Sequence, residues 1–437
     1  MAKKTKAANL SIEEKLEQAL IVPGYEPYKI PDNWCWTNLK TVCNLDNGIK
    51  HNNESLVYFD AKTLREITEP VSRNSGVIVE KGQKVILVDG ENSGEVFVIP
   101  DRGYMGSTFR ILNISKQFDE MYIRYFIDIF REELKKNKIG SAIPHLNKEL
   151  FYGLQFPLPP LSEQQRIVER IESLFSKLDE AKEKAQEVIN SFETRKAAIL
   201  HKAFSGELTA KWREENGVGI ESWERKRISE CCKLGSGGTP SRKKPNYYTG
   251  DIPWIKTGEI NWNTVNYSEE SITQEAIDNS SAKVYAPGAV LVAMYGMGIT
   301  RGKAAILGIE AATNQAVCVL QPKGYLFNRY LYFFFMCNYW DIREQAVGGN
   351  QLNLSATIIG KLNIDIPNLE EQYVITELLD SIIEKEYQTK QIAESVIDQI
   401  DAMKKAILAR AFRGELGTND PEEESAVELL KQILSGE

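Results

Sequence analysis

The sequence has few of the residues that build metal sites, disulfide frameworks and membrane spans. Its 437 residues include only six cysteines and three histidines, with no Cys-x-x-Cys pair and with the histidines far apart. We therefore expect neither a zinc site nor a disulfide framework. We expect a reducing, cytoplasmic location. No apolar core of a signal peptide is visible near the N-terminus. The most apolar run, residues 325–340, is too short to cross a bilayer and contains Arg329 and Asn338, so we expect no membrane association.

The sequence also lacks a convincing catalytic motif. Gly296-x5-Gly302-Lys303 resembles a phosphate-binding loop, but its spacing is one residue too long and neither Ser nor Thr follows the lysine. No predicted strand runs through G-x-G-x-x-G into a helix, which is the pattern of a nucleotide or S-adenosylmethionine cradle. We therefore expect no catalytic residue, no cofactor-binding residue and no metal ligand in this chain.

Negative charge is concentrated near the C-terminus. The formal net charge is −8, and residues 369–437 alone sum to −9. Residues 1–160 sum to 0, residues 161–208 to −1 and residues 209–368 to +2. A local cationic patch in the first 368 residues can still bind phosphates, because the field at the contact matters more than the total charge.

An internal repeat organises the chain. Residues 161–208 align without a gap on residues 369–416, with 20 of 48 positions identical. Each copy predicts one long helix, with capping boxes at Ser162-x-x-Gln165 and Asn368-x-x-Glu371 and C-caps at Gly206 and Gly414. Apolar residues recur at alternating steps of three and four, which is the pattern of a coiled-coil seam. The predicted seam residues are Ile167, Ile171, Leu174, Leu178, Val188, Phe192 and Ile199 in the first copy, and Ile375, Leu379, Ile382, Val396, Ile400 and Ile407 in the second.

The seam has polar interruptions at Arg195 in the first copy and at Glu386 and Thr389 in the second. A helix of this length spans about 65 Å, so a lone copy would expose a long apolar stripe. The simplest arrangement is that the two copies pack on each other.

Two globular halves alternate with the two helices. Trp34-x4-Leu39-x3-Cys43 begins the first half, and Trp223-x4-Ile228-x3-Cys232 begins the second with the same spacing. In each half two β-rich runs flank a polar loop, and a helix follows before the long repeat, which predicts an α+β fold. The expected division is 1–24 (tail and short helix), 25–158 (first half), 159–209 (first long helix), 210–366 (second half), 367–416 (second long helix) and 417–437 (acidic tail with a short helix).

Because no catalytic motif is present, we consider side chains that could bind nucleic acid. Lysine and arginine can bind phosphates, while asparagine and glutamine can pair with adenine edges. The candidate DNA-binding residues of the first half are Lys50, Asn52, Asn53, Arg65, Arg73, Asn74 and Arg102. Those of the second half are Thr239, Ser241, Arg242, Lys243, Lys244, Tyr247, Lys256, Arg301, Asn314, Gln315, Asn350 and Gln351.

The chain resembles the specificity subunit of a type I restriction-modification system. The resemblance rests on residues 157–179 (PLPPLSEQQRIVERIESLFSKLD), the AFSGEL ending of the first helix, and the GGTPS and DIPWI segments of the second half. It implies two α/β target recognition domains that each read half of a split sequence in double-stranded DNA. It also implies an antiparallel coiled coil that binds two methyltransferase subunits, with restriction motor subunits joining later. S-adenosylmethionine, Mg²⁺ and ATP would then belong to those partner subunits. The first half departs from the pattern, since residues 46–51 replace a GGTPS-like segment.

Two readings remain open at this point. The first is a non-catalytic subunit that recognises a DNA sequence. The alternative is a coiled-coil scaffold that joins proteins without sequence-specific DNA binding.

Overall fold

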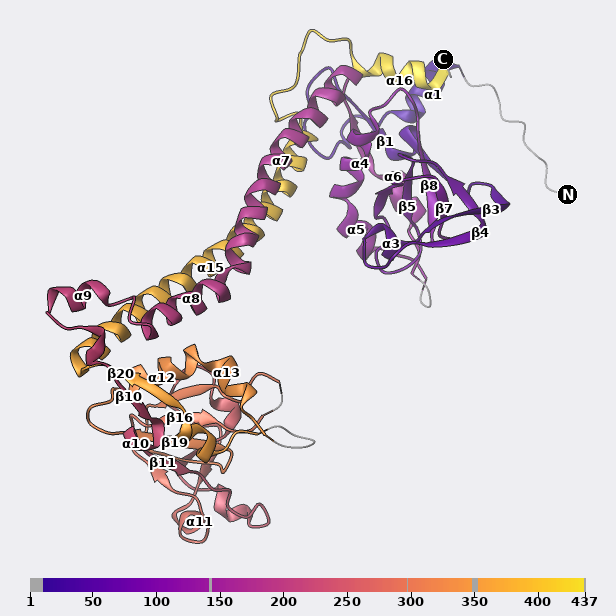
Figure 1. The fold of residues 1–437 in the computed structure, drawn as a ribbon. Coiled ribbons are helices and arrows are strands. Elements are labelled where there is room, and N and C mark those ends of the chain that lie inside the picture. The colour runs from indigo at the N-terminus through magenta and orange to yellow at the C-terminus, as the bar shows by residue number, and fades with distance from the viewer. Residues whose placement is uncertain (1–10, 141–143, 297, 348–352, 436–437) are drawn as a thin grey trace. The chain divides into compact units, whose positions relative to one another are not determined.

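A computed structural model describes residues 11–140, 144–296, 298–347 and 353–435. The chain separates into two compact units, one formed by Met1–Ala185 with Ser395–Glu437 and the other by Gln186–Glu394. Each unit contains one globular half and a part of both long helices, which Figure 1 labels α7 and α15.

In the first unit a central sheet separates a helical layer from a small barrel. The sheet has the strand order β2-β8-β5-β6, and β3, β4 and β7 close the barrel. Alternate residues of a strand point to opposite faces. Ile86 therefore packs in a core cluster with Phe126 of α4, whereas its neighbour Val85 packs with Phe59 of the barrel. Figure 1 shows α4 on one side of this sheet and β3 and β4 on the other.

The strands of the first unit are β1 Cys35–Asn38, β2 Cys43–Asp46, β3 Lys50–Phe59, β4 Val71–Val79, β5 Lys84–Leu87, β6 Val96–Val98, β7 Gly103–Met105, β8 Phe109–Ile114 and β9 Gln155–Leu158, with β1 paired to β9. Its helices, besides the long pair, are α1 Ile12–Ala19, α2 Leu39–Val42, α3 Ala61–Leu64, α4 Glu120–Ile129, α5 Arg131–Lys136, α6 Lys148–Gly153 and α16 Ala426–Ser435.

The globular half of the second unit repeats this layering. A five-stranded sheet, β11-β19-β16-β17-β13, has α12 against one face and a four-stranded sheet, β14-β12-β18-β15, against the other. Along β16, Val290 packs in a cluster with Leu331 of α12, while Leu291 packs with Ile255 of β12. The predicted α+β class is thus confirmed in both halves.

The strands of the second unit are β10 Glu224–Arg227, β11 Cys232–Ser236, β12 Ile252–Ile255, β13 Thr264–Val265, β14 Ser271–Ile272, β15 Val284–Tyr285, β16 Val290–Ala293, β17 Ala304–Leu307, β18 Ala311–Thr313, β19 Val317–Pro322 and β20 Asn363–Ile366, with β10 paired to β20. Its helices are α8 Phe192–Phe204, α9 Ala210–Glu215, α10 Ile228–Cys231, α11 Gln274–Asp278, α12 Asn328–Cys337, α13 Tyr339–Glu344 and α14 Ala356–Lys361, with 3₁₀ turns at Ile220–Ser222, Pro245–Tyr248 and Thr257–Glu259.

The long helix α15 Leu369–Ala411 packs antiparallel against α7 Leu161–Asn190 in the first unit and against α8 in the second. In the first unit Lys404 pairs with Asp179 at 2.5 Å and Lys182 with Asp401 at 2.9 Å, so residue numbers rise along one helix as they fall along the other. In the second unit two of the three polar interruptions of the seam meet each other. Arg195 binds Glu386 at 2.7 Å. A paired polar group inside a seam fixes its register, which an apolar contact alone does not.

Of the thirteen predicted seam residues, six are buried and seven are half-buried, and the ends of the seam also contribute to the globular cores. Ile167 and Ile171 are fully buried in the same cluster as Phe126, and Ile375 and Leu379 in the same cluster as Leu331. Near the helix ends the buried position shifts by one residue, because a straight α-helix advances by 3.6 residues per turn and not by 3.5. Half-buried seam residues are Leu174, Leu178, Val188, Ile199, Ile382, Val396 and Ile407, whereas Phe192 and Ile400 are buried.

The first long helix is divided, which corrects the expectation of one continuous helix. A turn at Ser191 separates α7 from α8. The Ser191 hydroxyl donates to the carbonyl oxygen of Glu187 at 2.6 Å, and the Arg195 guanidinium donates to that of Val188 at 3.2 Å. Such side-chain bonds compete with the backbone ladder of the helix. The predicted C-caps are confirmed, since Gly206 and Gly414 adopt φ of +80° and +72°.

Leu174→Asp is expected to lower the stability of the first unit by at least about 2 kcal/mol, because it loses apolar burial and desolvates a carboxylate in the seam. It should also weaken binding of the methyltransferase subunit that the sequence resemblance implies as a partner. Thermal unfolding and gel filtration with that subunit measure the two effects. Ser176→Asp, at an exposed position of the same helix, is the matched control. Normal stability and normal assembly of Leu174→Asp would contradict the seam assignment.

A repeated polar contact, which we call a latch, fastens each globular half to its long helix. In the first latch Trp34 Nε1 donates to the Glu163 carboxylate at 2.7 Å, and Asn419 Nδ2 donates to the same oxygen at 2.9 Å. In the second latch Trp223 Nε1 donates to the Glu371 carboxylate at 3.0 Å. Both carboxylates come from the repeat, 208 residues apart, and both are fully buried.

The latches differ in their remaining partners. Glu371 also accepts from Arg213 at 2.6 Å and from the Thr209 hydroxyl at 2.7 Å, so its charge is balanced by a buried guanidinium. Glu163 has amide and indole donors in place of a bonded cation, and burial raises its pKa. The same buried negative charge is therefore compensated in one unit and costly in the other.

In each repeat, the glutamine that follows the latch glutamate hydrogen-bonds the start of the helix that covers the sheet. Gln164 Oε1 accepts from the backbone N–H of Asp119 at 2.9 Å, at the start of α4. Gln372 Oε1 accepts from that of Phe327 at 2.7 Å, at the start of α12. The Glu-Gln pair of each repeat thus binds two parts of a globular half. The glutamate binds the tryptophan at the beginning of the half, and the glutamine binds the helix that covers its sheet.

The capping predictions at the starts of the long helices need correction. Ser162 lies inside α7 and its hydroxyl donates to Glu423 at 2.7 Å, so the first predicted capping box is wrong. Asn368 Oδ1 does accept from the backbone N–H of Glu371 at 2.9 Å. The Glu371 carboxylate is bound in the second latch, and only half of the second box forms.

The two terminal segments form the short helices expected of them, and both pack on the first half. Ala19 of α1 and Ala426 and Leu430 of α16 belong to its core cluster. Arg166 of α7 binds Glu423 of the acidic segment at 2.8 Å. All six cysteines are free thiols, and burial raises the pKa of Cys35, Cys43 and Cys318 to about 12. None of the helices in the described ranges is both long and apolar enough to cross a membrane.

Candidate nucleic-acid interface

A polar groove of about 540 Å³ lies on one face of β3 and β4 in the first half. In the register of these strands Lys50 faces Val77, Asn52 faces Ser75 and Tyr58 faces Val71. On β3 the lining residues are an even number of positions apart, as residues on one face of a strand are. On β4, Arg73, Ser75 and Val77 alternate in the same way, and the backbone of Gly76 between them also lines the groove. The groove is lined by Asn47, Lys50, Asn52, Tyr58, Arg73, Ser75, Gly76, Val77, Met105, Gly106, Ser107, Phe109 and Arg110.

The lining carries three cations and no carboxylate, which suits a polyanion. The Arg73 guanidinium lies 3.4 Å from the centroid of the Tyr58 ring. Arg110 donates to the carbonyl oxygens of Phe109 at 2.6 Å and of Ser107 at 3.1 Å. Of the predicted residues, Lys50, Asn52 and Arg73 meet here. Tyr58 and Arg110 were missed, although the alternation along β3 could have pointed to Tyr58.

Other predicted residues of the first half lie elsewhere or are already paired. Arg65 forms an ion pair with Glu95, and Arg102 binds Glu54 at 2.6 Å and Glu80 at 3.2 Å. The hydrogen bond to Glu54 raises the pKa of Arg102, so its charge is stabilised within the protein. Asn74 falls on the face of β4 opposite to the groove, and Asn53 lies in β3 with its side chain outside the described part.

In the second half the GGTPS segment, residues 237–241, is held against the sheet. A Cβ at Gly237 would stand 2.0 Å from the carbonyl oxygen of Thr313, so only glycine fits this approach. The Gly238 carbonyl accepts from Trp254 Nε1 at 3.0 Å, and the Pro240 carbonyl accepts from the Tyr248 hydroxyl at 2.6 Å. The GGTPS and DIPWI segments therefore pack on each other in the folded half.

The cations that follow this segment are mostly bound to partners within the half. Arg242 pairs with Glu270 at 2.7 Å, and Lys256 pairs with Glu269 at 2.8 Å. The Arg242 hydrogen bond is the main cause that lowers the pKa of Glu270. Lys243 and Ser241 are exposed beside them. Displacing these carboxylates would cost part of the energy gained from phosphate contacts.

Tyr247 is not available for stacking on a base, which corrects its prediction as a DNA-binding residue. It is 2% exposed and packs in a cluster with Trp254 and Ile272. Its hydroxyl accepts from Lys244 Nζ at 2.7 Å. The two aromatic residues after the lysines looked alike in the sequence, but this ring is buried by its own half.

Four of the remaining predicted residues of the second half, Thr239, Arg301, Asn314 and Gln315, lie in described loops between strands. Thr239 hydrogen-bonds Gln315, which is exposed, and Asn314 Oδ1 accepts from the backbone N–H of Ala316 at 3.1 Å. Arg301 is half-buried, and its carbonyl oxygen accepts from Arg343 at 2.5 Å. Asn350 and Gln351 lie outside the described residues.

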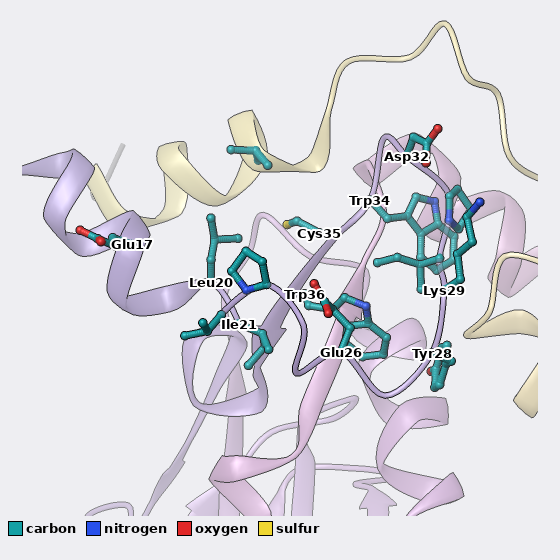
Figure 2. A pocket seen from close by; sticks show the side chains of 15 residues that line it. Glu17, Leu20, Ile21, Glu26, Tyr28, Lys29, Asp32, Trp34, Cys35 and Trp36 are labelled. Carbon is teal, nitrogen blue, oxygen red and sulfur yellow. The ribbon is translucent and has the colours of Figure 1, made fainter.

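A cavity of about 850 Å³ in the first unit is unsuited to nucleic acid. Figure 2 shows it between the segment that follows α1 and the indoles of Trp34 and Trp36. Its charged lining residues are Glu17, Glu26, Asp32 and one lysine, Lys29. A phosphate backbone would meet net negative charge there. In the described residues no group of three or more His, Cys, Asp or Glu could hold a metal ion.

The fold and these surfaces define a duplicated protein, in which two layered α/β halves with polar, cation-bearing loops are each latched to a pair of antiparallel helices. The pattern of the family described as type I restriction modification DNA specificity domain matches residues 31–191 and 220–396. The chain belongs to this family.

Individual relatives agree with this assignment. The MjaVIII specificity subunit of Methanocaldococcus jannaschii is 26% identical over 363 residues, which cover 78% of this chain and 81% of that one. The EcoKI specificity subunit of Escherichia coli is 20% identical and covers 93% of this chain and 96% of its own length. The solved structure of the HsdS subunit from Thermoanaerobacter tengcongensis superposes with a TM-score of 0.61 at 20% identity, over 89% of this chain and 99% of that one. A chain from a study of assembly and conformational transition of the type I R-M system gives a TM-score of 0.68 at 20% identity, over 89% and 100%.

Proposed function

We propose that this chain is the non-catalytic DNA-specificity subunit of a type I restriction-modification complex, in which each globular half reads one half of a bipartite target. The observation that carries the proposal is the duplication of a whole recognition unit. Two layered halves with different loop surfaces are attached to equivalent points of a repeated helix by equivalent latches. Two copies of one scaffold with unlike loops suit two unlike half-sites.

The paired helices serve as the spacer between the readers. Readers that approach one face of B-DNA have centres about 34 Å apart, one helical turn. A helix of 43 residues such as α15 extends about 65 Å and can carry two attachment points at that separation. An unread run of base pairs between the half-sites follows from this arrangement.

The methyltransferase subunits, two in number, would dock on the outer faces of the helices. On α15 the large side chains of Tyr373, Leu378, Tyr387, Ile392 and Met403 are 36–65% exposed. At about 100° per residue, Leu378, Ile392 and Met403 fall on one side of the helix, and exposed apolar residues on a shared side mark an interaction surface. S-adenosylmethionine, Mg²⁺ and ATP belong to these subunits and to the restriction motor subunits that join them.

Ile392→Lys is expected to weaken methyltransferase binding at least tenfold and to leave the stability of the chain unchanged. Ile392 is 65% exposed and lies on the same side of α15 as Leu378, beside the seam. Gln391→Lys adds the same charge at an exposed position about 100° around the helix and is the control. Titration by analytical ultracentrifugation measures the affinities. Equal binding by both variants would exclude this face.

DNA binding by the assembled complex tests the proposal against a scaffold function. Affinity is measured for modified-site fragments and for shuffled fragments between 50 and 200 mM salt, as a rough range over which phosphate contacts weaken. We expect tight binding to one set of sequences and a steep loss with salt. Affinity that ignores base sequence would favour a protein scaffold without specific DNA binding.

A further inference from the structure

Arg73 differs from three of the other arginines predicted to bind DNA. Arg65, Arg102 and Arg242 each bind a carboxylate of the protein. Arg73 is exposed, and its one recorded contact in the described part of the chain is the face of Tyr58. Its five N–H donors are therefore not committed to a protein acceptor.

The position of Arg73 suits the major groove of DNA. It lies on β4, which is exposed from Val71 to Ser75 and pairs antiparallel with β3. A two-stranded β-ribbon fits the major groove of B-DNA. On the same face, Lys50 and Asn52 flank the groove in which Arg73 stands.

The stack on Tyr58 prepares the guanidinium for planar recognition. With the group held over the ring at 3.4 Å, less side-chain freedom is lost on binding. The plane of a guanidinium presents two parallel donors, and the guanine edge in the major groove presents two acceptors, O6 and N7. Arg110 of the same groove is less suited, because two backbone carbonyls already occupy its NH1.

We propose that Arg73 reads a guanine in the half-site of the first globular half, through paired hydrogen bonds to O6 and N7. The inference rests on the proposed function and adds the base and the residue that reads it. Lys50 then supplies a phosphate contact beside it, since a lysine binds as a compact charge and not as a planar fork.

The test maps modified sites in the complete complex with Arg73→Ala, Arg73→Lys and Asn74→Ala. Asn74 lies on the opposite face of the same strand and is the matched control. We expect the first half-site to contain a G·C pair. Discrimination in favour of this G·C pair should fall about 10- to 100-fold with Arg73→Ala, while recognition of the second half-site remains unchanged. The Asn74→Ala control should keep the wild-type motif.

Arg73→Lys separates base reading from phosphate binding. A phosphate contact survives this change, but a bidentate contact to guanine does not. We therefore expect the lysine variant to lose discrimination at the same base pair as the alanine variant. Retention of the full motif by both variants, or a first half-site without a G·C pair, would overturn the inference. A wild-type complex with no bipartite motif would refute the proposed function itself, so the two failures are distinguishable.

Discussion

Glu371→Gln is expected to destabilise the second unit by about 3–5 kcal/mol, because it leaves the buried Arg213 guanidinium without its counter-charge. For a unit of this size each kcal/mol lowers the melting temperature by about 2–4 °C, so a drop of about 6–20 °C should appear in thermal unfolding. Adding Arg213→Leu removes the uncompensated charge and should recover part of the loss. A variant that melts like the wild type would show that the second latch does not hold this unit together.

Glu163→Gln is the matched change in the first unit, and we expect it to stabilise this unit at neutral pH and not to destabilise it. Its amide oxygen can accept from both Trp34 and Asn419, and no bonded cation is left unpaired. Burial raises the pKa of Glu163 in the folded state, so its proton stabilises the fold at low pH and that stability is lost as pH rises through the folded value. The variant should therefore gain stability relative to wild type between pH 4 and pH 7, as an approximate window around the ordinary carboxyl pKa. Unfolding at several pH values measures this, and a constant difference would contradict it.

Exchange of residues 46–150 for the same span of another specificity subunit is expected to change one half of the modified sequence completely. This span carries the groove of β3 and β4, whereas the second half and both long helices remain. The other half of the motif and the gap should stay as they are. Sequencing of the methylated genome reads the outcome, and a change in both halves or in neither refutes independent reading.

The boundary of that exchange cuts through one hydrophobic core. Phe126 lies inside the span, while Phe151 and Phe156 of the same cluster lie outside it. An exchange of residues 25–158 keeps these aromatic contacts together and is the matched variant. If the shorter exchange is unstable and the longer one switches the motif, the fault lies in packing and not in recognition.

The helical framework could be predicted because its signals are local or repeated. The seam positions, Gly206 and Gly414 follow from periodicity and from the ungapped alignment of the two copies. The latches left a signal too, since Trp34 matches Trp223 and Glu163 matches Glu371. Their pairing could not be derived, because 129 and 148 residues separate the bonded partners and only the folded half brings them together.

The recognition residues were less accessible to sequence reasoning, because a free cation and a paired one look alike in a sequence. Arg102 meets a carboxylate 48 residues away, and Arg242 meets one 28 residues away. Arg73 has no such partner among the described residues and lies on the same face of β3 and β4 as Lys50. Strand register and burial distinguish Arg73 from the paired arginines, and both depend on tertiary structure.

The most direct test of the account is to map every modified site in DNA methylated by the assembled wild-type complex. Two independent readers on a fixed spacer should produce one motif with two unlike half-sites and a constant unread gap between them. A single continuous motif, a variable gap, or modification without sequence preference would contradict the central claim that each latched half reads its own part of the target.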